Sequence, residues 1–166
     1  MLAIAVLFST AVAACSDDDD DGGGTEPDTE FEATLSGSDE VPARSTPASG
    51  NATISIQGSA IVYTVDVANI ANVVLSHIHI APPGENGPVR LNLCGTDDSP
   101  ACTSGTGTLV SGSNGNTLDI TFDSLVSAIR AGNAYVNVHT SDGDETTMDI
   151  PGDFPAGEIR GQLTPQ

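Results

Sequence analysis

The chain has no lysine and no tryptophan, and it is poor in both basic and aromatic residues. Four arginines face 23 Asp and Glu residues, which gives a formal net charge of -19. Nucleic acids and anionic membrane surfaces are bound through clustered basic side chains, so the composition predicts that nucleic acid is not a partner. With two Tyr and four Phe, a core must be built mainly from Val, Ile, Leu and Ala, which favours a β-sandwich or barrel over a helical bundle.

The first 30 residues have the composition of a targeting signal followed by a linker. Residues 2–14 form an apolar run too short to span a bilayer, and two small residues stand directly before Cys15. This arrangement resembles the lipobox of bacterial lipoproteins, in which the cysteine is lipidated. It lacks the basic residue that normally precedes the apolar run. Ordinary secretion with an unmodified Cys15 is the alternative.

These features predict three parts of the chain. We expect a lipoprotein signal peptide over residues 1–14, an acidic, Gly-rich disordered tether over residues 15–30 and one folded domain over residues 31–166. The expected location is a bacterial cell envelope, where the lipid on Cys15 anchors the domain to the membrane.

From Phe31 onward, short β-like runs alternate with turn residues. The predicted strands are residues 31–35, 50–57, 59–67, 71–80, 89–93, 106–110, 117–122, 135–140 and 157–163, with turns at residues 57–59 and 112–116. The one predicted helix spans residues 123–132, with Asp123 or Ser124 as its N-cap and Gly132 at its end. This pattern predicts an all-β fold, an antiparallel sandwich or Greek-key barrel with one short helix.

All three histidines lie in two of these strands. Side chains alternate between the two faces of a strand, so His77 and His79 share the face opposite the neighbouring isoleucines. In the same way, Tyr135, Asn137 and His139 share one face of their strand.

The spacing of the histidines suggests a metal site. Residues two apart on a strand have Cα atoms about 6.5–7 Å apart, so two imidazoles can reach one ion, and His139 can be the third ligand if its strand lies beside the first. Copper and zinc are the ions that such a site would bind. In the alternative hypothesis, the histidines hydrogen-bond the loop of residues 82–88 and the strand backbone without an ion.

Glu158 and Arg160 share one face of the last strand. They predict either a cross-strand salt bridge or a role for Glu158 beside the histidines, as a fourth ligand or a hydrogen-bonding partner. A water in the fourth position is a further alternative. The acidic loop of residues 142–153 could bind Ca²⁺, but it lacks the EF-hand spacing and is otherwise expected to be solvated.

Cys94 and Cys102 remain as a pair if Cys15 carries a lipid. In an oxidising compartment an even pair favours a disulfide that closes a small loop. A thiolate metal site is the alternative, but a third cysteine and Cys-x-x-Cys spacing are both missing.

Four segments together, residues 31–42, 77–88, 131–140 and 157–161, resemble the CHRD domain, first noticed in chordin. The resemblance covers nearly all of residues 31–163. It implies an immunoglobulin-like Greek-key sandwich in an extracytoplasmic protein, and it does not bring an established activity.

Two hypotheses for function follow. The first is a lipid-anchored binding or adhesion module of the CHRD type, which presents loops and a polar sheet face, including Tyr135, Asn137 and Arg160, to an unknown protein or surface ligand. The second is a protein that binds Cu or Zn through His77, His79 and His139. The His-x-His strand is also similar to the copper-binding strand of Cu/Zn superoxide dismutase, but three histidines are too few for that two-metal centre. No Gly-x-Ser-x-Gly motif occurs, and we do not expect an enzyme.

Overall fold

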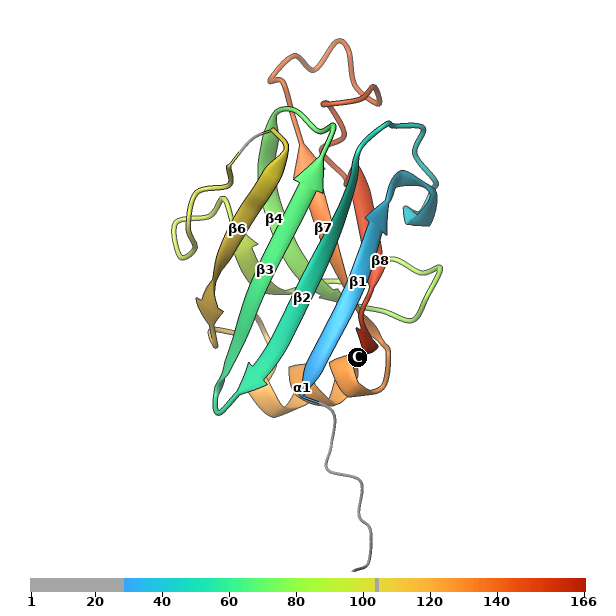
Figure 1. Ribbon diagram of the computed structural model, residues 1–166. Coiled ribbons are helices and arrows are strands. Elements are labelled where there is room, and N and C mark those ends of the chain that lie inside the picture. Colours follow the sequence, from blue (N-terminus) through green and yellow to red (C-terminus); the bar gives the residue numbers. More distant parts are fainter. Residues whose placement is uncertain (1–28, 104) are drawn as a thin grey trace, which may run out of the picture.

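A computed structural model describes residues 29–103 and 105–166, and this part of the chain is mostly β-structure (Figure 1). The signal peptide, the lipidated Cys15 and almost all of the tether were predicted for residues that lie outside the described part. The elements in chain order are β1 (Glu30–Ser36), the 3₁₀ helix η1 (Gly37–Asp39), β2 (Ser49–Gln57), β3 (Ala60–Ala68), β4 (Val73–Ile80), β5 (Val89–Cys94), β6 (Gly107–Asn114), α1 (Phe122–Arg130), β7 (Ala134–Thr140), β8 (Ile159–Gln162) and β9 (Thr164–Pro165).

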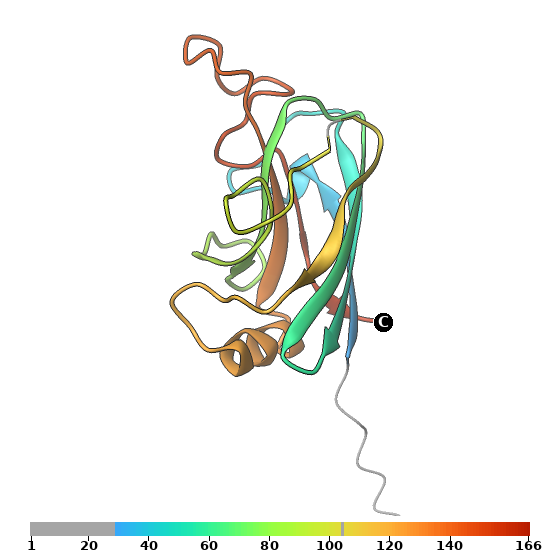
Figure 2. The same cartoon turned by 90° about the vertical axis from the view of Figure 1, so that its left-hand side faces the viewer.

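The strands form one antiparallel sheet in the order β5-β4-β7-β8-β1-β2-β3-β6, with β9 beside β1. The sheet folds over into two layers, and its two edge strands nearly meet (Figures 1 and 2). A β-bridge joins Leu91 to Thr117, and the Asn114 Nδ2 donates to the Asn92 carbonyl oxygen at 3.0 Å. The predicted antiparallel sandwich is therefore confirmed, as a sandwich that is almost closed into a barrel. The immunoglobulin-like Greek-key detail stays a prediction.

The core lies between the two layers and follows from the period-two alternation of the strands. In β1 the buried positions are Phe31, Ala33 and Leu35, while the residues between them are exposed. α1 packs Leu125 and Ile129 against this core at one end of the sandwich (Figure 1). Among the described residues, no helix is long and apolar enough to cross a membrane.

The region before α1 differs from the prediction. The strand predicted at residues 117–122 is wrong: Asp119 has a left-handed backbone (φ 58°), which interrupts an extended chain, and the helix begins at Phe122. The N-cap is Thr121, whose Oγ1 accepts from the backbone N–H of Ser124, and neither Asp123 nor Ser124 has this role. The predicted turn at residues 112–116 is also wrong in part, because β6 continues to Asn114.

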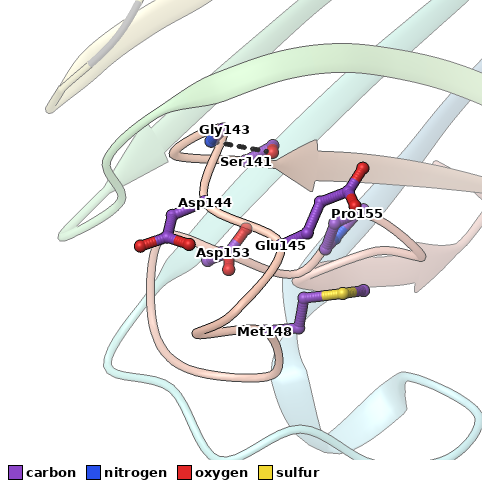
Figure 3. A pocket seen from close by; sticks show the side chains of 7 residues that line it. All are labelled: Ser141, Gly143, Asp144, Glu145, Met148, Asp153 and Pro155. Atoms are coloured by element: carbon purple, nitrogen blue, oxygen red, sulfur yellow. Dashed lines mark hydrogen bonds between the residues drawn. The ribbon is translucent and has the colours of Figure 1, made fainter.

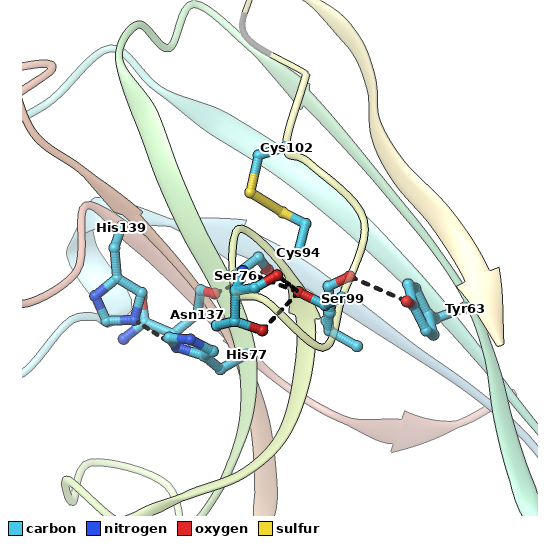
Figure 4. The surroundings of a disulfide bond; sticks show 10 residues. Tyr63, Ser76, His77, Cys94, Ser99, Cys102, Asn137 and His139 are labelled. Carbon is cyan, nitrogen blue, oxygen red and sulfur yellow. Dashed lines mark hydrogen bonds between the residues drawn. A yellow bond between two sulfur atoms is a disulfide. The ribbon is translucent and has the colours of Figure 1, made fainter. Parts of the chain in front are cut away.

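Two local predictions are confirmed. Gly132 follows α1 with a left-handed backbone (φ 69°), as expected of a residue that ends a helix. Cys94 and Cys102 form a disulfide, which ties the end of β5 to the loop that leads to β6 (Figure 4).

Candidate metal centre

The pairing of β4 with β7 brings the three histidines together. His77 lies opposite Asn137 and His79 opposite Tyr135, so His139 is a diagonal neighbour of His77 on the same face. The other face of both strands is mainly apolar, and Ile78 is fully buried in the core. The predicted division of the two strands into a histidine face and a core face is therefore confirmed.

The three imidazole rings form a compact cluster, which we call the histidine cluster: His77, His79 and His139. The ring centroids are 5.0 Å apart for His77 and His139, 5.7 Å for His77 and His79, and 5.9 Å for His79 and His139. Each residue offers one ring nitrogen, and these three atoms lie within 4.8 Å of one another. Figure 4 shows the closest pair, in which the His77 Nδ1 is 3.3 Å from the His139 Nε2.

Two loops fix the orientation of the rings. The His79 Nδ1 is 2.9 Å from the Gly87 carbonyl oxygen, and the His139 Nδ1 is 3.0 Å from the Pro155 carbonyl oxygen. A carbonyl oxygen only accepts hydrogen bonds, so both rings carry their proton on Nδ1 and keep a lone pair on Nε2. The Nε2 of His79 is buried and has no hydrogen-bond partner. The contact with Gly87 also confirms part of the alternative hypothesis, that the histidines bond the loop of residues 82–88.

Burial keeps the cluster neutral. It lowers the pKa of His77 to about 3 and that of His79 to about 4, with neighbouring histidines adding to the shift in both cases. Burial also lowers the pKa of His139. Neutral imidazole is the form that binds a metal ion, because its lone pair is free.

The polar face of this sheet layer is buried. Tyr135, Asn137 and Arg160 are each 2–3% exposed, because the loops between the strands cover them. The Arg160 guanidinium lies 3.8 Å from the centroid of the Tyr135 ring, and that ring stacks on His79 at 4.8 Å. The prediction that this face is presented to a partner is therefore wrong.

The arginine of this stack is held by the loop between β4 and β5. Its guanidinium donates to the Asn86 Oδ1 and to the Glu85 carbonyl oxygen, at 3.1 and 2.9 Å. In the same loop, the Gly87 carbonyl oxygen accepts a hydrogen bond from the His79 Nδ1–H, and the backbone N–H of Gly87 donates to the Tyr135 hydroxyl oxygen. A side chain at Gly87 would collide with the Ile80 carbonyl oxygen, so glycine is needed for this close approach.

Glu158 does not join the histidine cluster. Its carboxylate is fully buried and accepts from the Thr46 and Thr140 hydroxyl groups and from the backbone N–H of Gly152. The predicted fourth-ligand role is corrected on this ground, since these three donors hold the carboxylate away from the cluster. The predicted salt bridge to Arg160 is also wrong, because within the described residues that arginine is bound to the loop instead.

Sequence reasoning missed Glu40, which lies beside this face. Its side chain is 6% exposed, and burial raises its pKa to about 7 although Arg160 and Arg44 oppose the shift. A side chain at Gly157 would come within 2.7 Å of the Glu40 Oε1 and the Asn137 amide, so the three residues are in close contact. Glu40 belongs to a segment that carries the family resemblance, and that was its only signal in the sequence.

The comparisons with known proteins identify the family of the chain. The family model of the CHRD domain matches residues 31–148. The chain therefore belongs to the CHRD domain family. No curated protein and no solved structure matches the chain.

Proposed function

We propose that this CHRD domain is a binding module that holds a divalent transition metal, Cu²⁺ or Zn²⁺, at His77, His79 and His139. The buried His79 Nε2 carries the proposal, because it keeps its lone pair and has no hydrogen-bond donor to meet it. A buried polar atom without a partner is costly, and a bound ion would remove that cost. Copper and zinc are the ions that imidazole ligands suit best.

The spacing of the ligand atoms supports a metal as well. Two nitrogens bound at about 2.0–2.1 Å to one tetrahedral ion lie about 3.3–3.4 Å apart. The His77 Nδ1 and the His139 Nε2 are 3.3 Å apart already. The carbonyl oxygens of Gly87 and Pro155 accept hydrogen bonds from the Nδ1–H groups of His79 and His139, which is how ligand histidines are commonly held in metal sites. A fourth position remains for water or another ligand.

Metal titration of the full chain tests the proposal. After treatment with EDTA, we expect one Cu²⁺ or Zn²⁺ per chain by calorimetry and a higher melting temperature with metal. His79→Ala should abolish both effects. Tyr63→Phe is the matched control. It removes a buried hydrogen bond that the hydroxyl of Tyr63, on β3, donates to the Leu93 carbonyl oxygen, and it touches no histidine, so it should lower stability without weakening metal binding. No heat and no shift in melting temperature with either ion would refute the proposal.

Membership of the CHRD family supports the broader statement that the domain binds a ligand. We further propose that lipid on Cys15 attaches the protein to the bacterial cell envelope, as the apolar run before that residue suggests. Cys15→Ala should move the protein from the membrane fraction to the soluble fraction. An unchanged distribution, with no lipid on the N-terminal peptide, would contradict the anchor.

A further inference from the structure

A buried carboxylate in the loop between β7 and β8 lacks a partner. Asp153 is only 2% exposed, and its Oδ2 is buried with no hydrogen bond. The arginine that reaches this loop, Arg44, bonds Asp149 instead, at 2.6 Å. An ionised carboxylate that is removed from water without a donor or a cation is strongly destabilised. Among the described residues, the Asp153 carboxylate therefore has no ion pair, although the Arg44 guanidinium lies 5.0 Å from the centroid of the neighbouring Phe154 ring.

Asp153 lines a pocket that has a negative wall. The pocket has a volume of about 320 Å³, and Asp144 and Glu145 line it together with Asp153 (Figure 3). The other residues that line it are Ser141, Gly143, Met148 and Pro155, so none of the lining residues is basic. Three carboxylates around one hollow raise the local concentration of cations.

We propose that this pocket binds Ca²⁺, with Asp153 as the buried ligand and Asp144 and Glu145 as ligands from the exposed part of the loop. Ca²⁺ takes six to eight oxygen ligands in flexible geometry, which carboxylates, backbone carbonyls and waters supply together. Mg²⁺ demands near-ideal octahedral geometry and gives up its water reluctantly, so an exposed loop suits it less. One oxygen of Asp144 accepts from the N–H and hydroxyl of Thr146, which leaves its other oxygen for the ion.

The Ca²⁺ site is separate from the histidine cluster, because none of the residues that line the acidic pocket belongs to that cluster. The two sites are neighbours through one residue. Pro155 lines the acidic pocket, and its carbonyl oxygen accepts a hydrogen bond from the His139 Nδ1–H, with 3.0 Å between the oxygen and the nitrogen. The residue that orients His139 is thus also part of the pocket wall.

Calcium titration of the full chain tests the proposal. After treatment with EDTA and without transition metal, we expect one Ca²⁺ per chain by calorimetry, with a Kd of about 10⁻⁴ to 10⁻³ M, the range of extracellular calcium modules. The melting temperature should rise with Ca²⁺ and much less with Mg²⁺. Asp153→Asn keeps the size of the side chain and should weaken Ca²⁺ binding at least about tenfold. Asp98→Asn, an equal loss of charge at an exposed residue outside the pocket, should leave Ca²⁺ binding unchanged.

The stability of the calcium-free protein gives a second readout. Because Asp153→Asn removes a buried carboxylate that has no hydrogen-bond donor, this variant should melt at the same or a higher temperature than the wild type in EDTA, and Ca²⁺ should not stabilise it. If Asp153→Asn does not fold, the exposed pair Asp144→Asn and Glu145→Gln provides the test, and both should weaken binding. Absence of heat at about 10 mM Ca²⁺, well above the expected Kd, or equal binding by wild type and variants would overturn the proposal. Either result would leave the histidine cluster untouched.

Discussion

The buried Glu40 should make the stability of this protein fall as the pH rises. Its pKa is raised from 4.5 to about 7 in the folded chain, so between these two values the folded protein holds a proton that the unfolded chain releases. The contribution of Glu40 to stability is therefore complete below about pH 4.5 and is lost as the pH rises through about 7. One pKa unit corresponds to about 1.4 kcal/mol, so the loss amounts to about 3 kcal/mol well above pH 7.

Glu40→Gln isolates this effect, because glutamine has the same shape and cannot ionise. The measurement is urea denaturation of the metal-free wild type and the variant from about pH 5 to pH 9. We expect the free energy of unfolding of the variant to gain about 2.5 kcal/mol on that of the wild type across this range, because a small part of the loss occurs below about pH 5. Contributions from other titrating groups cancel in the difference. The matched control is Glu32→Gln, on the exposed face of β1. The free energy of unfolding of this control should stay within about 0.5 kcal/mol of the wild-type value at each pH. A difference between Glu40→Gln and the wild type that does not change with pH would refute the assignment of a neutral, buried Glu40.

Three further predictions follow from the described contacts. Because the pKa values of the histidine cluster are lowered, the unfolded chain binds protons below about pH 6.5 that the folded cluster excludes. On acidification, each histidine should therefore cost the metal-free Glu40→Gln variant up to about 1.4 kcal/mol of stability per pH unit. A free energy of unfolding that does not change with pH in urea denaturation would contradict this. Glu158→Gln should destabilise the fold by about 2–4 kcal/mol, because an amide NH₂ replaces one of the two carboxylate oxygens that accept from Thr46, Thr140 and Gly152. The variant should still bind metal. Loss of metal binding in the folded variant would restore Glu158 as a ligand. Replacing Cys94 and Cys102 by alanine should cost about 2–3 kcal/mol in denaturant, and finding both thiols free to alkylate in the unreduced, unfolded wild type would contradict the bond.

Strand periodicity was enough to predict which side chains share a face. Alternation in β4 and β7 separates His77 and His139 from Ile78 and Val136, and the structure has the same division. The neighbour relationship of β4 and β7 could not be derived in this way, because it joins residues about 60 positions apart and depends on how the whole sheet closes. The family resemblance supplied the segments without their pairing.

The errors fall where a loop or one backbone angle overrides the local pattern. Residues 117–122 alternate like a strand, but Asp119 turns the chain and Thr121 starts a helix there. Glu158 stands at the end of the β8 region, where its carboxylate meets hydroxyl groups from two other segments. No pattern within one strand reports on such contacts. The burial of Glu40 and Asp153 escaped prediction as well, because no strand pattern surrounds either residue.

X-ray absorption at the metal edge of the zinc- or copper-loaded full chain tests the central claim most directly. We predict a shell of about three imidazole nitrogens at about 2.0–2.1 Å, which is lost in His79→Ala. A shell made only of oxygen ligands, or the same spectrum in wild type and His79→Ala, would show that the histidine cluster does not bind the ion.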